Sequence, residues 1–130
     1  MTLLDTHVWL WWVNQDRQRL RSSWLPHLSG PGPLFVSAIS CFEAAWLINS
    51  KRVVIGRASN EWFELALAGS GISVAPVTES IARLSADLPH HHKDPQDRMI
   101  IATAIINDAK ILSADERFAA YKELEGRLVP

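Results

Sequence analysis

The sequence predicts an α/β fold with a parallel sheet, and three observations lead to that prediction. Short apolar runs of strand length alternate along the chain with longer segments whose apolar residues recur at helical spacing. Glycine and proline interrupt the chain between such segments, most clearly at Gly30-Pro31-Gly32-Pro33. The chain has 130 residues, the size of one domain, and contains no internal repeat. We therefore expect one domain over residues 1–130.

Four strands are expected, with a short fifth near the C-terminus. Each is an apolar run too short for a helix. The predicted strands are Thr2 to Asp5, Leu34 to Ile39, Ile72 to Ala75 and Ile111 to Ser113, with Leu128-Val129 as the last. In a parallel sheet the carboxyl ends of these strands meet at one edge, where ligands bind.

In the first half of the chain, helices are expected both before and after the second strand in sequence. Apolar residues recur at helical spacing between positions 8 and 13, and Asp16 is the predicted N-cap of a second helix that reaches Leu28. A further helix is predicted from Cys41 to Lys51. Ser40 is its expected N-cap.

The second half carries four more predicted helices. Asn60 is expected to cap the first, and the next is a short helix from Thr78 to Asp87. Asp94-Pro95 combines an N-cap residue with a proline at the first helical position, which predicts the start of the apolar helix running through Met99 to Ala109. Glu116 to Tyr121 is the last.

Composition narrows the function classes. With 48% hydrophobic and 21% charged residues, the chain has the material for a core and too little charge for disorder. The formal charge of −1 excludes a global basic field, so any nucleic-acid binding must be local. The lone Cys41 excludes an internal disulfide, and no apolar run approaches the roughly 18 residues of a transmembrane helix. We expect a soluble, cytoplasmic protein without a signal peptide.

Four acidic residues are expected at the ligand-binding edge of the sheet. Asp5 ends the first strand, and Glu43 lies one helical turn past the second. Asp115 follows the fourth strand by two residues, and Asp97 lies in the first turn of the helix that begins at Asp94. Clustered carboxylates repel one another unless a cation neutralises them, and an all-oxygen set suits Mg²⁺ or Mn²⁺ better than Zn²⁺. The chemistry this indicates is metal-assisted phosphoryl transfer.

Each of these acids also has a purely structural explanation. Ser40-x-x-Glu43 has the spacing of a capping box, in which Glu43 would bond the Ser40 backbone N–H. Asp94 fits a helix cap better than a metal ligand, whereas the two explanations are equally good for Asp97. Asp5 and Asp115 stand where each could cap the helix that follows. Four such coincidences at one sheet edge favour a site.

Other conspicuous residues have structural interpretations. The stretch Leu88 to Lys93 is predicted to be a loop, and the His90-His91-His92 run within it is interpreted as solvated, because adjacent residues do not share a face. Cys41 is expected to be a small buried apolar residue. The tryptophans are expected in the core or at an oligomer interface rather than in base stacking: Trp9, Trp11, Trp12, Trp24, Trp46 and Trp62.

Four blocks of the chain resemble the PIN-domain ribonucleases, most closely the VapC-like toxins of toxin–antitoxin modules. The blocks are Leu3-Leu4-Asp5-Thr6-His7, Val36-Ser37-Ala38-Ile39-Ser40 with Glu43, Asp94-Pro95-Gln96-Asp97-Arg98 with the following Ile100-Ile101-Ala102-Thr103-Ala104, and Leu112-Ser113-Ala114-Asp115-Glu116-Arg117-Phe118. The resemblance runs from Met1 to Val129. It implies a three-layer α/β/α domain with a Mg²⁺- or Mn²⁺-dependent endoribonuclease site, in which Asp5, Glu43, Asp97 and Asp115 form the acidic quartet.

The resemblance also implies partners. These are an RNA substrate, a second copy of the chain in a homodimer, and a VapB-like antitoxin that blocks the acidic pocket. Cys41, the aromatic first helices and the short tail depart from the family's pattern, and none of them touches the quartet. Arg98 is interpreted as a structural or phosphate-facing side chain.

The leading hypothesis assigns Asp5, Glu43 and Asp97 to one divalent ion, with Asp115 completing its shell or positioning a second. Thr6 and Ser113 are expected to orient the carboxylates through their hydroxyls. A non-catalytic RNA- or partner-binding module is the second hypothesis, and a phosphoryl-accepting regulatory domain is the third. A positive substrate track would have to come from local cations, for example Arg17, Arg19, Arg21, Lys51 and Arg52.

Overall fold

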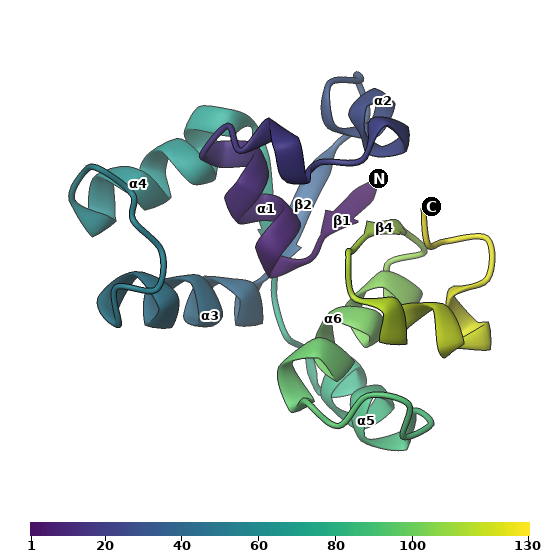
Figure 1. Ribbon diagram of the computed structural model, residues 1–130. Coiled ribbons are helices and arrows are strands. Elements are labelled where there is room, and N and C mark those ends of the chain that lie inside the picture. The colour runs from purple at the N-terminus through teal and green to yellow at the C-terminus, as the bar shows by residue number, and fades with distance from the viewer.

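The computed structural model describes all residues from Met1 to Pro130. At its centre lies a four-stranded sheet with the order β3-β2-β1-β4, in which every pairing is parallel (Figure 1). The strands are β1 (Thr2–Leu4), β2 (Leu34–Ser37), β3 (Ile72–Ala75) and β4 (Lys110–Leu112). The predicted α/β fold with a parallel sheet is therefore confirmed.

The helices are as follows: α1 (Thr6–Val13), α2 (Leu25–Leu28), α3 (Ala38–Asn49), α4 (Ser59–Ala66), α5 (Glu79–Asp87) and α6 (Pro95–Ile106). Short 3-10 turns span Arg17–Arg19, Ser22–Trp24, Ala68–Ser70, Glu116–Ala120 and Lys122–Leu124. None of the helices combines the length and apolarity needed to cross a bilayer.

Both faces of the sheet are covered by helices. Successive side chains of a strand point to opposite faces, so each face has apolar residues to bury. Leu3 packs into a cluster with α5, α6 and the C-terminal turns, whereas Leu4 packs into a second cluster with α1 and α4. Figure 1 shows α1, α3 and α4 on one side of the sheet and α5 and α6 on the other. The three-layer α/β/α arrangement implied by the resemblance is confirmed.

The start of α6 follows the prediction from Asp94-Pro95. The Asp94 carboxylate accepts a hydrogen bond of 2.8 Å from the Gln96 backbone N–H, and Pro95 occupies the first helical position. This cap fixes the orientation of the first turn of α6. It thereby fixes the position of Asp97.

The start of α3 corrects the prediction. Strand β2 ends at Ser37 rather than Ile39, and Ser37 is the N-cap, with its hydroxyl accepting from the Ile39 backbone N–H at 3.2 Å. Ser40 lies inside the helix, fully buried, where its hydroxyl accepts a hydrogen bond from Thr6. Because Ser40 is not a cap, the capping-box explanation of Glu43 is wrong.

Other boundaries also differ: β1 ends at Leu4 rather than Asp5, β4 is shifted by one residue from the prediction, and α6 ends at Ile106 rather than Ala109. Ala58, not Asn60, precedes α4. Asp16 starts only a 3-10 turn and forms an ion pair with Arg19 at 3.1 Å instead of capping a helix. The predicted last strand is reduced to one bridge between Ile111 and Leu128.

Candidate active site

The four predicted acids share one cavity at the carboxyl ends of the strands. This acidic cavity has a volume of about 380 Å³ and is lined by Asp5, Glu43, Asp97 and Asp115, together with His7, Trp11, Asp94, Ala114 and Arg117. The acids come from four separate elements: the ends of β1 and β4, helix α3 and the first turn of α6. The fold therefore brings together residues that are up to 110 positions apart in sequence.

Asp5 is both a helix cap and a member of the cavity. One of its carboxylate oxygens accepts a 2.9 Å hydrogen bond from the Val8 backbone N–H at the start of α1, and the other accepts from the Ser113 hydroxyl. Burial raises the pKa of Asp5, although these two hydrogen bonds and nearby His7 oppose the rise. Asp5 thus caps α1 and also lines the acidic cavity.

Ser113 joins the ends of two neighbouring strands. Its hydroxyl donates to Asp5, after β1, and accepts a 3.1 Å hydrogen bond from the Asp115 backbone N–H, after β4. The Ser113 hydroxyl thus contacts one carboxylate of the acidic cavity directly. Thr6 instead donates its hydroxyl hydrogen bond to Ser40 at 2.9 Å, so it ties α1 to α3.

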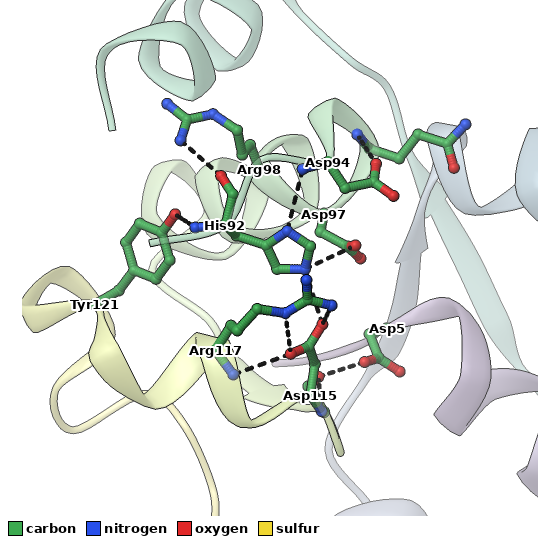
Figure 2. A network of polar contacts seen from close by, with 10 residues as sticks. Asp5, His92, Asp94, Asp97, Arg98, Asp115, Arg117 and Tyr121 are labelled. Carbon is green, nitrogen blue, oxygen red and sulfur yellow. Dashed lines mark hydrogen bonds and ion pairs between the residues drawn. The ribbon is translucent and has the colours of Figure 1, made fainter. Parts of the chain in front are cut away.

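His92 connects the other two aspartates, as Figure 2 shows. Its Nε2 lies 2.8 Å from Oδ2 of Asp115 and 3.0 Å from Oδ2 of Asp97. The Nδ1 atom accepts a hydrogen bond of 3.2 Å from the Asp94 backbone N–H, so the ring proton must be on Nε2, facing the carboxylates. His92 thus holds the two acids close together.

The loop that carries His92 is anchored from two sides. The His92 backbone N–H donates to the Tyr121 hydroxyl at 3.0 Å, and the Arg98 guanidinium donates to the His92 carbonyl at 3.1 Å (Figure 2). Arg98 is buried and uses all five of its N–H donors on backbone carbonyls, those of Ser85, Ala86, Leu88, Pro89 and His92. Of the two interpretations of Arg98, the structural one is therefore correct.

The prediction of a solvated histidine run is wrong for His92. His90 and His91 are exposed, but His92 is only 1% exposed. Within a run of three identical residues, the residue type itself does not indicate which one is buried. That choice depends on Tyr121, which is 29 residues away in sequence, and on Arg98. The only local sign is that His92 stands two residues before the cap Asp94.

The electrostatics of the acidic cavity favour a bound cation. Burial, with the neighbouring charges of Asp94, Glu43 and Asp115, raises the pKa of Asp97 to about 7, although His92 opposes the rise. Partial burial raises the pKa of Asp115, but hydrogen bonds from Arg117 and His92 outweigh that effect and lower it. Burial and the neighbouring acids together thus disfavour the charged form of Asp97. The donors are mainly carboxylate oxygens, a set that fits a hard divalent cation such as Mg²⁺ or Mn²⁺.

Comparison with known proteins decides the family. The family pattern described as PIN domain matches residues 2–124. The chain belongs to the PIN-domain family. A PIN-domain relative, Ribonuclease VapC22 from Mycobacterium tuberculosis, is 32% identical over 121 residues, which are 92% of this chain and 91% of the relative.

Solved structures share the PIN-domain fold at lower identity. The VapBC2 complex from Rickettsia felis, bound to a promoter DNA fragment, aligns with a TM-score of 0.68 at 14% identity, covering 94% of this chain and 93% of that one. A toxin–antitoxin complex from Klebsiella pneumoniae aligns with a TM-score of 0.64 at 19% identity, covering 100% and 97%. FitAcB from Neisseria gonorrhoeae gives 0.64 at 18% identity, with the same coverage.

Arginine side chains line both the acidic cavity of this PIN domain and the cavity beside it. Arg117, which the sequence analysis did not select, pairs with Asp115 through Nε at 3.1 Å and Nη2 at 3.0 Å. Of the arginines suggested for a substrate track, Arg19 and Arg52 line a larger neighbouring cavity of about 720 Å³. This neighbouring cavity shares His7 and Trp11 with the acidic cavity, and it also contains Asp16, which is paired with Arg19.

The tryptophans and Cys41 fall into different environments. Trp9, Trp24 and Trp62 are buried in the core, as expected. Cys41 is only partly buried, and burial raises the pKa of its thiol, which disfavours the reactive thiolate. Trp46 is 61% exposed and does not belong to the core.

Proposed function

We propose that this PIN domain is a metal-dependent endoribonuclease that hydrolyses RNA phosphodiester bonds. The observation that carries the proposal is the meeting of Asp5, Glu43, Asp97 and Asp115 in one cavity. The relative at 32% identity, named as a ribonuclease, supports RNA as the substrate. A pure binding module has no need of clustered negative charge where phosphates must approach.

We assign the carboxylates of Asp5, Glu43 and Asp97 to one Mg²⁺ or Mn²⁺ ion, with Asp115 completing its shell or holding a second. A divalent ion bound there would lower the pKa of a coordinated water and neutralise charge on the phosphate oxygens. Ser113 orients Asp5 by donating to its carboxylate. His92 orients Asp97 and Asp115 by lying within 3.0 Å of an oxygen of each. Arg117 pairs with Asp115 and favours its charged form.

We further propose that the protein is the toxin of a VapBC-like module in the cytoplasm, that it forms a homodimer, and that a VapB-like antitoxin silences it. Support comes from the family membership and from the toxin–antitoxin complexes among the structures that share its fold. In the acidic cavity, an antitoxin side chain that carries positive charge would compete with the metal for the same carboxylates.

The experiment is cleavage of total cellular RNA by the purified, antitoxin-free protein with Mg²⁺ or Mn²⁺, in parallel with EDTA and the variant Asp97→Asn. Discrete cuts that disappear in EDTA and in Asp97→Asn are expected. Asp87→Asn is the matched control, because Asp87 is an exposed aspartate at the end of α5 and should cut like the wild type. A folded, metal-loaded protein that binds RNA but never cuts it would instead support the non-catalytic binding module.

A further inference from the structure

Helix α3 presents two large aromatic side chains to solvent. Phe42 is 54% exposed and Trp46 is 61% exposed, and their ring centroids lie 6.2 Å apart. They are separated by one helical turn, so they lie on the same side of α3. Trp9, Trp24 and Trp62, in contrast, are buried in the core. An exposed aromatic pair therefore calls for a binding role.

The pair borders the acidic cavity. Phe42 and Trp46 line a separate cavity of about 330 Å³, together with Glu43, Leu47, Arg52 and Gln96. Glu43 also lines the acidic cavity, and Gln96 is the residue before Asp97. A ligand with a phosphate at the acidic cavity would therefore reach the aromatic pair with the group next to that phosphate.

We propose that the cavity at Phe42 and Trp46 binds a nucleobase of single-stranded RNA, adjacent to the phosphate at the acidic cavity, with Trp46 as the stacking surface. This inference rests on the proposed function and deepens it, because the subsite would contribute to sequence preference. For Trp46 alone, the proposal replaces the expectation that the tryptophans lie in the core or at an oligomer interface and do not stack on bases.

The chemistry of the lining matches a nucleobase. Single-stranded RNA is bound by stacking unpaired bases on aromatic rings and by hydrogen bonds to their edges. The Gln96 amide offers both a donor and an acceptor for a base edge. Arg52 lines this cavity and the larger neighbouring one, so the backbone of the same strand would meet its positive charge.

A nucleobase fits better than a protein surface. The centre of a protein–protein interface is depleted in acidic residues, whereas Glu43 lines this small cavity. Glu43 lines both this cavity and the acidic cavity, so a base bound here would lie next to the phosphate that the acidic cavity is proposed to hold. A second copy of the chain is the competing occupant of this cavity. The experiment below distinguishes that copy from a nucleobase.

The test measures binding rather than turnover. In the Asp97→Asn background, which suppresses hydrolysis, labelled single-stranded RNA carrying the preferred sequence is titrated and followed by fluorescence anisotropy. Trp46→Ala is expected to weaken binding by about 5- to 100-fold, whereas Trp46→Phe retains most of the affinity. Ile106→Ala, which removes an exposed apolar side chain from the end of α6, is the control and is expected to bind unchanged.

An RNA with a single abasic position locates the base. At one position the missing base should cost as much affinity as Trp46→Ala, and combining the two should cost no more than either alone. Unchanged binding by Trp46→Ala, or losses that simply add, would overturn the inference. Loss of dimer in Trp46→Ala, measured by sedimentation, would also overturn it, by assigning the pair to an interface between copies.

The two proposals can fail separately. If the wild type cuts RNA and Trp46→Ala cuts and binds as well as the wild type, the nucleobase subsite is wrong and the endoribonuclease stands. If RNA binding depends on Trp46 but no RNA is cut under any metal condition, the subsite stands and the endoribonuclease is wrong. Absence of RNA binding by the wild type would overturn the subsite.

Discussion

His92 Nε2 lies 2.8 Å from Oδ2 of Asp115, and the same atom lies 3.0 Å from Oδ2 of Asp97. A single N–H thus spans two carboxylates that come from different elements of the fold. With Nδ1 occupied by the Asp94 backbone N–H, the ring cannot turn over without losing a hydrogen bond. His92 therefore determines how far apart these two acids stand.

Replacing His92 should reduce RNA cleavage without removing any of the four acids. We expect His92→Ala to lower activity by about 10- to 100-fold, as is usual when a group that orients metal ligands is lost. His92→Gln should retain part of the activity, because its amide N–H can reach the position of Nε2. Steady-state cleavage rates at several Mn²⁺ concentrations provide the measurement. The exposed neighbour His90→Ala is the control. Equal activity of His92→Ala and His90→Ala would contradict the assignment.

Arg98 should be essential for folding rather than for cleavage alone. Arg98→Ala removes a donor from five backbone carbonyls, of which only that of Pro89 keeps another, the Tyr121 hydroxyl. Each buried carbonyl left unsatisfied costs about 1 to 3 kcal/mol before relaxation and hydration. We expect a loss of at least about 3 kcal/mol in the free energy of unfolding, measured by urea denaturation. Arg83→Ala removes an exposed arginine paired with Glu79 and should cost less than about 1 kcal/mol. Similar losses in the two variants would show that the Arg98 contacts contribute little.

Asp97 should make the metal-free protein less stable as the pH rises. The folded chain holds the Asp97 proton up to a pKa of about 7, whereas a carboxyl with the ordinary value of 3.8 loses it earlier. Between these values the folded state binds more protons, so stability falls as pH increases through that window. Asp97→Asn should therefore be more stable than the wild type at pH 8 in EDTA, by on the order of 1 to 2 kcal/mol, and should show no such gain at pH 4.

Thermal unfolding at the two pH values, with and without Mg²⁺, tests this expectation. Added Mg²⁺ should stabilise the wild type at pH 8 and should stabilise Asp97→Asn much less, because binding to the folded state alone raises stability. A variant that is less stable than the wild type at pH 8 without metal would contradict the raised pKa of Asp97.

Ser113 should affect metal affinity through Asp5. Ser113→Ala removes the hydroxyl that donates to the buried Asp5 carboxylate, so the carboxylate loses one of the two hydrogen bonds that orient it. We expect Mn²⁺ to bind about 10- to 100-fold more weakly in isothermal titration calorimetry. Thr6→Val is an instructive comparison, because the Thr6 hydroxyl bonds Ser40 and not an acid. A larger loss of Mn²⁺ affinity in Thr6→Val than in Ser113→Ala would reverse the roles given to these hydroxyls.

The elements that local signals could specify are those the sequence predicted well. Strand β3 is found at the predicted residues, because Gly71 adopts a positive φ just before it and Pro76 follows it. The Asp94 cap is likewise a local arrangement. The choice between Ser37 and Ser40 as cap of α3 was not local, since it depends on where β2 stops pairing with β3.

The candidate site divides in the same way. The strand ends place Asp5 and Asp115 near one another in any parallel sheet with this strand order. His92 could not be identified from sequence, because Tyr121 and Arg98 bury it from elsewhere in the fold. Arg117 was overlooked because one exposed arginine among many carries no distinguishing pattern. Its pairing with Asp115 becomes visible only in three dimensions.

The double role of Asp5 restricts how an inactive form of the protein should be made. Alanine at this position would remove the acid and also uncap α1, at a cost of about 1 kcal/mol in stability, so a loss of cleavage would mix two causes. Asparagine caps a helix about as well as aspartate and keeps an oxygen for the Val8 N–H, while it removes the charge. A complex trapped for crystallography, or an inactive protein expressed for raising antibodies, is therefore better prepared with Asp5→Asn.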